Sequence, residues 1–231
     1  MSVKTMIKLD SIQKVYRASA PVRVFENLNI EVDKGEFVAL TGPTGSGKTT
    51  LVNLITGFTR PTGGRILVDG TEITRLSNDE MAEFRAQRMG VVFQTSNLIP
   101  DMTVFENVEL PLAIRGERKE RRKENVMEAL KMMGVLEFAD RSLSTLSIGE
   151  KMRVEIARAL VTDPPILIMD EPIENLDSLS KEYVLMLLRG GHCIQGKTVI
   201  VTSHSSKMIN ATSRVIRLKK SLDLTPTLLA H

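Results

Sequence analysis

The sequence predicts an α/β protein in which helices cover both faces of a parallel β-sheet, with an antiparallel β subdomain at the N-terminus and a helical insertion. Three nearly continuous apolar runs, at residues 36–40, 166–169 and 198–201, have the composition of strands that are buried on both faces. Stretches of helical character separate these runs, and such alternation is typical of a parallel sheet. Before residue 33, apolar and polar residues alternate, which indicates strands with one face in water.

The N-terminal part of the chain predicts short strands and then a strand–loop–helix unit. Several short strands are expected within residues 5–32, and in the last of them, LNIEV at 28–32, apolar residues alternate with polar ones. The apolar run at 36–40 leads through a glycine-rich loop into residues 48–55, which have a helical pattern.

The next segment predicts one more strand and a helix. Residues 65–68, RILV, form a strand that Asp69-Gly70 ends with a turn. Residues 77–88 have a helical pattern, and Ser77 and Glu80 stand at the spacing of a capping box, in which each residue bonds the backbone of the other.

A helical insertion is expected between two parts of the sheet. From about residue 102 to 143 helical patterns dominate, and one helix face carries Val126, Leu130 and Met133. We therefore expect a single domain, 1–231. Its parts are a core with the β subdomain at 1–95 and 162–220, a helical subdomain at about 96–161, and a weakly patterned tail at 221–231.

Composition excludes several classes of partner and compartment. The chain has 31 basic and 28 acidic residues, which is too near balance to indicate nucleic acid, so no nucleic-acid partner is expected. Cys193 is the only cysteine, which leaves no intrachain disulfide and fits a reducing compartment. The N-terminus lacks the apolar core of a signal peptide. No run approaches the roughly 20 apolar residues that cross a bilayer, so work at a membrane would need a second chain.

Residues 42–49, GPTGSGKT, match the phosphate-binding pattern G-x-x-x-x-G-K-[ST] at every fixed position. Phosphate oxygens need several converging donors, and backbone N–H groups converge only in a tightly curled loop, which Gly45 and Gly47 permit. Lys48 is expected to reach the β- and γ-phosphates of ATP, and the Thr49 hydroxyl to bind Mg²⁺. The expected nucleotide contacts in this loop are Gly42, Pro43, Thr44, Gly45, Ser46, Gly47, Lys48, Thr49 and Thr50.

Two adjacent acidic residues follow the second buried strand. Asp170 and Glu171 end the stretch ILIMDE, where the strand emerges at the edge of the sheet at which α/β proteins bind ligands. Asp170 can hold Mg²⁺, while Glu171 can polarise an attacking water. An Asp-Glu pair by itself could also start a loop or cap a helix, and the phosphate loop favours the functional interpretation.

With these motifs the chain resembles the ATP-binding-cassette ATPases over nearly its whole length. The resemblance implies a P-loop NTPase core of the RecA-like type, with ATP and Mg²⁺ as ligands and ATP hydrolysis as the activity. Gln94, in VVFQ, looks like the family's glutamine that contacts Mg²⁺ and the water, and His204, after VIVTS, looks like the histidine that contacts the γ-phosphate. Tyr16 stands where an aromatic side chain stacks on adenine.

The stretch LSIGE, at 146–150, stands where the family has its signature LSGGQ. The resemblance implies that Ser147 and Gly149, with Glu150 beside them, face the γ-phosphate of the ATP bound by another subunit. The stretch ENLD, which ends in Asp177, resembles the loop that crosses the dimer interface.

Other interpretations of these residues stay open. Ser147 and Glu150 also have capping-box spacing, for a helix that runs to Leu160, and a capped helix N-terminus is compatible with anion binding. His204 could be an incidental histidine at a strand end, although its position after the third buried strand favours the functional role. Tyr16 could be an ordinary strand tyrosine with its hydroxyl in water.

The chain departs from the family pattern in two motifs. Ile148 replaces the first glycine of the signature, and Glu150 replaces its glutamine. Glu174 replaces a small residue just before the interface loop and adds a negative charge there. A carboxylate a few ångströms from a phosphate costs about 1 kcal/mol or more. We therefore expect secure nucleotide binding, with turnover that is slow or depends on a partner.

Residues 94–112 are similar to a subfamily that includes lipoprotein-releasing and macrolide- or peptide-exporting systems. The similarity implies two copies of the chain paired head to tail, or this chain with a related ATPase, at the cytoplasmic face of the membrane. It also implies a separate integral membrane transporter subunit that the ATPases power. Leu98 and Ile99 are candidates for the groove that receives this subunit, and core packing is the equal alternative.

Three rival functions come from other classes of protein. A DNA-repair or chromosome-organising cassette ATPase would carry a long coiled-coil or zinc-bearing insertion, and a small-molecule kinase would not need LSIGE or the histidine. The third rival is a nucleotide-gated clamp, which binds ATP, dimerises and barely hydrolyses. The altered signature keeps that alternative open.

Overall fold

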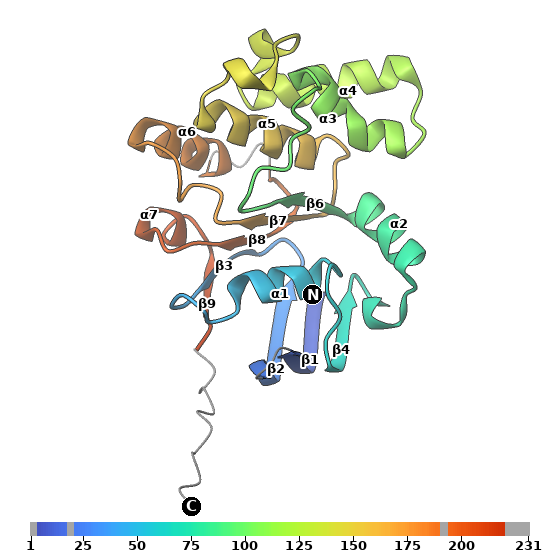
Figure 1. Cartoon of the computed structure of the whole chain (residues 1–231), viewed down its shortest axis with the longest axis vertical. Helices are drawn as coiled ribbons and strands as arrows, with labels where there is room; N and C mark the ends of the chain where they lie inside the picture. Colours follow the sequence, from blue (N-terminus) through green and yellow to red (C-terminus); the bar gives the residue numbers. More distant parts are fainter. Residues whose placement is uncertain (1–3, 18–20, 190–193, 220–231) are drawn as a thin grey trace, which may run out of the picture.

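The computed structural model of the chain describes residues 4–17, 21–189 and 194–219. These residues form two β-sheets, with helices packed against them (Figure 1). Cys193 and the expected tail at 221–231 lie outside the described residues. Within the described ranges, no helix has both the length and the apolar character that crossing a bilayer requires.

The larger sheet has five parallel strands in the order β6-β7-β8-β3-β9. Every residue of β7 and β8 is buried, which confirms the buried strands expected at 166–169 and 198–201. The two edge strands were not expected, because each has four residues and β6 follows a helix without an intervening turn. The strands are β3 (Phe37–Thr41), β6 (Met89–Val92), β7 (Ile166–Asp170), β8 (Thr198–Thr202) and β9 (Arg214–Arg217).

The smaller sheet is antiparallel in the order β2-β1-β4-β5. Several short strands were expected over residues 5–32, whereas β1 and β2 are two strands of 12 residues each. The pairing of β1 with β2 shifts register at several points, and Ser11 has a φ of 55°. These bulges interrupt the alternation of apolar residues without ending the strands. The bounds are β1 (Thr5–Tyr16), β2 (Val22–Asp33), β4 (Gly63–Val68) and β5 (Thr71–Glu72).

The parallel sheet separates two hydrophobic clusters. Along β7, Leu167 and Met169 belong to one cluster, while Ile166 and Ile168 belong to the other, as the alternation of side chains along a strand requires. Helix α1 lies between the two sheets, and α3, α4, α5 and α6 lie on the other side of the parallel sheet (Figure 1). The expected fold class, a parallel core with an antiparallel β subdomain and a helical insertion, is confirmed.

Three helices, α2, α3 and α5, begin at a serine or threonine that caps them. The side chains of Ser77, Thr103 and Ser147 each accept a hydrogen bond from the backbone N–H of a glutamate three positions on. The carboxylate of each glutamate accepts a hydrogen bond from the backbone N–H of the capping residue. The helices are α1 (Lys48–Ile55), α2 (Asn78–Arg88), α3 (Val104–Ile114), α4 (Lys119–Met132), α5 (Ile148–Leu160), α6 (Ser178–Arg189) and α7 (Ser206–Ile209). Short 3₁₀ turns are η1 (Ile73–Arg75), η2 (Leu136–Phe138) and η3 (Leu143–Thr145).

The segment between β6 and β7 is mainly helical, as expected. Helices α3, α4 and α5 pack against one another, and the predicted apolar face of Val126, Leu130 and Met133 is fully buried. The division of the chain at 96 and 161 stays a prediction.

Candidate functional site

The glycine-rich loop joins β3 to α1 in a tight curl. Gly45 and Gly47 have φ angles of 80° and 92°, in the left-handed region that favours glycine. At Gly47 a β-carbon would lie 2.6 Å from Val24 Cγ1 and 2.8 Å from Phe25 Cζ. Gly47 is also the N-cap residue of α1, so the same glycine gives the loop its curl and lets β2 approach the start of the helix.

Two polar side chains of the loop are buried in a way that suits an anion. Lys48 is 7% exposed, and its Nζ donates to the carbonyl oxygens of Gly42 at 3.1 Å and Pro43 at 3.4 Å. The Ser46 hydroxyl is buried and has no hydrogen-bond partner within the described part of the chain. A buried ammonium held by neutral oxygens, next to an unpaired hydroxyl at a helix N-terminus, fits a phosphate group.

A cavity of about 580 Å³ opens at the loop and joins it to three distant segments. The volume lies within the range of ligand pockets, about 300–1,000 Å³. Four of the expected site residues, Lys48, Gln94, Glu171 and His204, come together here although the sequence separates them widely. The lining residues are Val24, Thr44, Gly45, Gly47, Lys48, Thr49, Thr50, Gln94, Glu171 and His204.

The two acidic residues at the end of β7 are both anchored by Thr202 of β8. The Thr202 hydroxyl donates to Asp170 Oδ1 and accepts the Glu171 N–H at 2.9 Å. Asp170 is 3% exposed, so this bond satisfies a carboxylate that is taken out of water. Thr202 was not among the residues expected from the sequence, although its place at the end of a buried strand, two residues before His204, was a signal for it.

Glu171 is held in an uncommon backbone conformation. Its φ is 52°, in the left-handed region that costs a residue with a β-carbon about 1–2 kcal/mol. The Glu171 Oε2 accepts from Gln94 Nε2 at 2.8 Å, and its Oε1 lies 3.5 Å from His204 Nε2. Backbone strain of this kind persists where the surroundings impose it and is enriched at functional sites. Here it accompanies a carboxylate that faces both Gln94 and His204.

Glu174 lies three residues after Glu171 and turns inward. A turn closes from the Glu174 N–H to the Glu171 carbonyl oxygen at 3.3 Å. The Glu174 carboxylate accepts from Ser203 Oγ at 2.6 Å and from the His204 N–H at 2.8 Å. Burial by itself raises the pKa of Glu174, but the bonds from the Ser203 hydroxyl and the His204 N–H, with the Ser205 N–H nearby, hold this pKa below its ordinary value. The Glu174 charge, which the family resemblance puts near a dimer contact, is thus bonded to the segment that carries His204.

Asp177, at the end of the stretch ENLD, begins α6. Its carboxylate accepts the backbone N–H groups of Leu179 and Ser180, each at 3.0 Å, and the Ser180 hydroxyl at 2.6 Å. The Ser180 hydroxyl bond and these N–H bonds hold the pKa of Asp177 below its ordinary value. Asp177 therefore fixes the end of the loop that starts at Glu171.

The altered signature forms the start of α5. The Ser147 N–H donates to Glu150 at 2.7 Å and lowers the pKa of that carboxyl, while Ser147 Oγ accepts the Glu150 N–H at 3.2 Å. A β-carbon at Gly149 would lie 2.2 Å from Ser180 Oγ, so this glycine lets α5 and α6 meet closely. Ile148 is 64% exposed. Within the described residues, none of these four lines the cavity at the phosphate loop.

Tyr16 ends β1 and is about two-fifths exposed. The Lys14 Nζ lies 4.6 Å from the centroid of its ring, and Lys14 is itself buried and bonded to Thr59 Oγ1 and the Arg60 carbonyl oxygen. A cation so placed is attracted to the aromatic face. Among the described residues Tyr16 does not line the cavity, and its stacking role stays a prediction.

Leu98 and Ile99 differ in burial, because Leu98 is buried and Ile99 is half-buried. Leu98 is buried in the cluster that includes α3 and α5, and Ile99 exchanges backbone hydrogen bonds with the side chain of Asn107. Core packing is therefore the better interpretation of Leu98. A separate, mainly apolar groove of about 350 Å³ lies nearby, and its lining includes Phe58, Phe93, Leu110, Pro111 and Ile114.

The fold and this cavity define a P-loop nucleotide-binding protein, and comparison with known proteins gives the family. The ABC transporter family profile matches residues 25–174. An uncharacterized ABC transporter ATP-binding protein of Methanocaldococcus jannaschii, MJ0796, is 40% identical over 219 residues, 93% of each chain. The lipoprotein-releasing system ATP-binding protein LolD of Bacteroides thetaiotaomicron is 35% identical, over 92% of this chain and 96% of LolD.

A solved structure of MJ0796, a dimer in a post-hydrolysis state bound to ADP and phosphate, superimposes with a TM-score of 0.86. The match covers 93% of this chain and 95% of that one, at 38% identity. The chain belongs to the ABC transporter family: it is an ATP-binding subunit of such a transporter and an ATPase.

Proposed function

We propose that the chain powers a separate integral membrane subunit by ATP-driven dimerisation at the cytoplasmic face of the membrane. The observation that carries the proposal is the cavity that gathers Lys48, Thr49, Gln94, Glu171 and His204. Two relatives support it, since MJ0796 is dimeric with ADP and phosphate bound, and LolD belongs to a lipoprotein-releasing system. By this similarity, the work is extrusion of a lipoprotein, peptide or macrolide-like cargo.

The proposed roles follow from the chemistry of each group. The backbone of residues 42–48 and the Lys48 ammonium bind the triphosphate, and Tyr16 stacks on adenine. Glu171 accepts a proton from the attacking water, while Gln94 and His204 hold the water and the γ-phosphate in line. The strained backbone of Glu171 and its bonds to Gln94 and Thr202 preorganise this carboxylate.

The donor set also suits Mg²⁺. Thr49, Asp170 and Gln94 offer a hydroxyl, a carboxylate and an amide carbonyl oxygen, which are the hard ligands that Mg²⁺ prefers. Thr49 and Gln94 line the same cavity, and Asp170 precedes Glu171 at its edge. When bound there, Mg²⁺ would offset the negative charge of the phosphates.

A second copy of the chain, or a related ATPase, would complete the site. Ser147 and Gly149 stand at the N-terminus of α5, which packs on the face of the parallel sheet opposite to α1. A helix N-terminus attracts an anion, and this one does not border the cavity of its own chain within the described residues. Head-to-tail pairing would bring Ser147, Gly149 and Glu150 of one copy to the ATP of the other.

The apolar groove beside α2 and α3 is the proposed seat of the membrane subunit. Phe58 and Ile114 border it, and they are 51% and 69% exposed. Apolar side chains gathered at a hollow on the surface mark sites of protein–protein interaction. This groove replaces Leu98 as the candidate contact for the membrane subunit, because Leu98 is buried in the core.

Phosphate release from ATP by the purified chain, measured across a range of protein concentrations, tests the proposal. We expect the rate per molecule to rise with concentration, and Glu171→Gln to lower it about 100-fold or more, as expected for loss of a general base. Glu182→Gln is the matched control, because Glu182 is an exposed carboxylate on α6 that pairs with Lys207. A Glu171→Gln variant with the wild-type rate would contradict the roles proposed here.

The alternative is a nucleotide-gated clamp with little hydrolysis. The observations that favour it are the exposed Ile148 and the Glu150 carboxylate at the presumed composite site. If the wild type is as silent as Glu171→Gln yet still binds ATP, the clamp, or half of a heterodimeric machine, becomes the better interpretation.

A further inference from the structure

We propose that Glu174 is a positioning residue that sets the place of His204, and that it thereby couples the loop between β7 and α6 to the nucleotide site. The inference rests on the proposed function, because it assigns a residue to the hydrolytic site formed by Glu171 and His204. The Glu174 carboxylate accepts a hydrogen bond from the backbone N–H of His204, a contact that the sequence motifs do not predict.

Hydrogen-bond donors from one segment converge on the Glu174 carboxylate. Ser203 Oγ donates to Glu174 Oε1 at 2.6 Å, and the His204 N–H donates to the same oxygen at 2.8 Å. Ser203 Oγ in turn accepts the Ser205 N–H at 3.0 Å. Three consecutive residues after β8 are thus ordered around one side chain from another loop. The small residues that the family pattern has at position 174 carry no acceptor that reaches as far as the glutamate carboxylate.

Burial and charge both make these hydrogen bonds important. Ser203 is fully buried, so the donor hydrogen of its hydroxyl would lose its partner if residue 174 had no acceptor, although the oxygen would still accept the Ser205 N–H. Bonds to an ionised carboxylate are roughly twice as strong as bonds between neutral groups. The lowered pKa of Glu174 agrees with a carboxylate that stays ionised among these donors.

Glu174 is linked to the reacting groups through His204. The His204 Nε2 lies 3.5 Å from Glu171 Oε1, while its side chain is 44% exposed, so packing constrains the ring weakly. The hydrogen bond from the His204 N–H to Glu174 therefore directly constrains the backbone position from which the imidazole ring extends. Since the Glu174 N–H is bonded to the Glu171 carbonyl oxygen, both contacts of His204 lead back to the same short loop.

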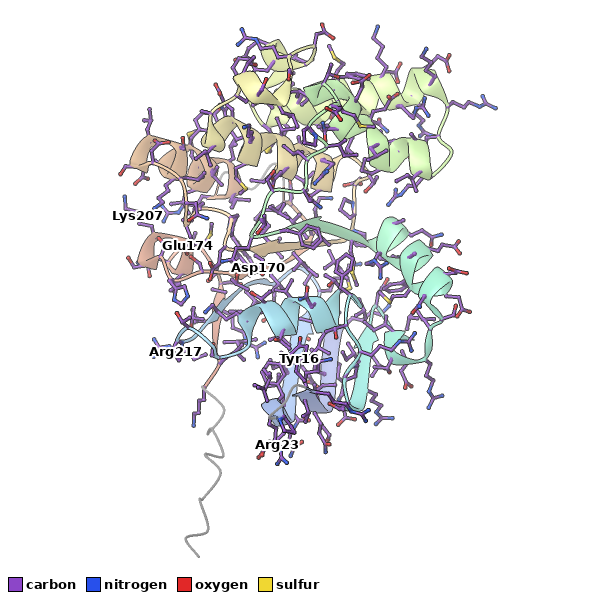
Figure 2. All side chains as sticks on the ribbon, viewed as in Figure 1. Tyr16, Arg23, Asp170, Glu174, Lys207 and Arg217 are labelled. Carbon is purple, nitrogen blue, oxygen red and sulfur yellow. The ribbon has the colours of Figure 1, made fainter. Side chains whose placement is uncertain are left out.

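Figure 2 shows Glu174 close to α7, the helix that follows Ser203 and His204. The loop from Glu171 to Asp177 ends at the N-terminus of α6, where Gly149 of α5 packs against Ser180. A shift of α5 or α6 would accordingly move Glu174, and with it the backbone of His204. This path runs from the helical part of the chain to the nucleotide site through contacts that the structure contains.

The test is a double-mutant cycle on the full chain, with single-turnover hydrolysis of radiolabelled ATP as the readout. We expect Glu174→Ala to lower the hydrolysis rate about tenfold while the KM for ATP changes less than about threefold, because misplacement of a catalytic group affects the reaction step. Glu174→Gln keeps an acceptor oxygen but makes weaker, uncharged bonds, so its rate should fall by no more than about threefold and lie between those of wild type and Glu174→Ala. In a His204→Ala background, Glu174→Ala should change the rate less than about twofold.

Each other outcome overturns the inference. A wild-type rate for Glu174→Ala would remove the role altogether. A Gln variant as slow as the Ala variant would show that the acceptor geometry is not what matters. Equal losses from Glu174→Ala with and without His204 would show that Glu174 does not act through the histidine.

Two further variants keep the result interpretable. Glu182→Ala removes a carboxylate that ties α6 to α7 through Lys207, and we expect it to leave the hydrolysis rate unchanged. If Glu174→Ala does not fold, Ser203→Ala can be used instead, because it removes one of the donors and keeps the carboxylate. This variant should also lower the hydrolysis rate. The Glu171→Gln result tests the proposed function separately, because it does not depend on Glu174.

Discussion

Asp170, Glu171 and Glu174 lie within five residues, and each carboxylate has a different set of partners. Asp170 is buried against the Thr202 hydroxyl, Glu171 faces Gln94 and His204, and Glu174 accepts from Ser203 and the backbone of His204. A carboxylate surrounded by donors from its own chain is ionised and occupied, whereas one that borders a cavity can act on a ligand. The partners therefore separate Glu171, the catalytic candidate that lines the cavity, from Glu174, the positioning residue, while Asp170 is a metal-binding candidate by its place beside Glu171 at the end of β7.

At the same scale, the altered signature makes a prediction about turnover. Restoring Gly at 148 and Gln at 150 should raise phosphate release about fivefold or more, because a carboxylate near a phosphate costs about 1 kcal/mol. Ile148 is exposed, so its removal leaves no cavity, and glutamine retains the capping box with Ser147.

The matched control for this prediction is Glu106→Gln. Glu106 forms the same capping box with Thr103 at the start of α3, so it reports the effect of neutralising a capping glutamate outside the signature. An unchanged rate in the Ile148→Gly, Glu150→Gln double variant would reject the idea that these two residues slow the enzyme.

At the scale of elements, three helices begin with reciprocal caps. In α2, α3 and α5 a serine or threonine and a glutamate satisfy each other's backbone N–H groups. In each case the backbone N–H bond, followed by the hydroxyl bond, holds the pKa of the glutamate below its ordinary value of 4.5. A negative charge in the first turn also interacts favourably with the helix dipole.

These caps predict a dependence of stability on pH. Since the folded pKa values are lowered, the contribution of the caps is fully present above the ordinary pKa and is lost as the pH falls through the folded value. The urea midpoint of wild type should exceed that of a Glu80→Gln, Glu106→Gln variant at pH 7, and the gap should shrink near pH 3. Glu128→Gln, an exposed change within α4, is the control. A gap that is constant or widens in acid would contradict the assignment.

At the scale of the whole molecule, the parallel sheet separates the phosphate loop from the signature helix. Helix α1 follows the loop and packs into one cluster, and α5 packs into the other. The Glu171–Asp177 loop leads from the edge of the sheet to α6, which meets α5 at Gly149. If the signature helix contacts ATP as proposed, the two parts of the site lie on different sides of one chain, and an ATP that touches both must lie between two chains.

This arrangement predicts a dimer that depends on ATP. With Glu171→Gln, which keeps ATP intact, sedimentation should show a species of twice the monomer's mass with ATP and the monomer with ADP, because the γ-phosphate contacts both copies only in the closed state. Adding Lys48→Met should abolish the dimer by removing the phosphate contact of a buried cation. A variant that stays monomeric at saturating ATP would favour a pairing with a different ATPase.

The sequence by itself determined the phosphate loop, the buried strands and the order of the acidic pair, glutamine and histidine along the chain. These features are local, because a curled loop needs glycines at fixed positions and a strand buried on both faces needs a continuous apolar run. The structure brings Gln94, Glu171 and His204 to the loop, as their places at the ends of neighbouring strands imply.

Only the tertiary structure decided what Thr202, Glu174 and Leu98 do. Thr202 anchors two carboxylates of a neighbouring strand, Glu174 bonds a segment about 30 residues away, and Leu98 is enclosed by helices that no local pattern places around it. Hydrogen bonds and burial depend on which groups become neighbours when distant segments pack, and a one-dimensional pattern carries no information on those distances. The family resemblance put the charge of Glu174 near a dimer contact. Its hydrogen bonds to Ser203 and His204 follow instead from this packing.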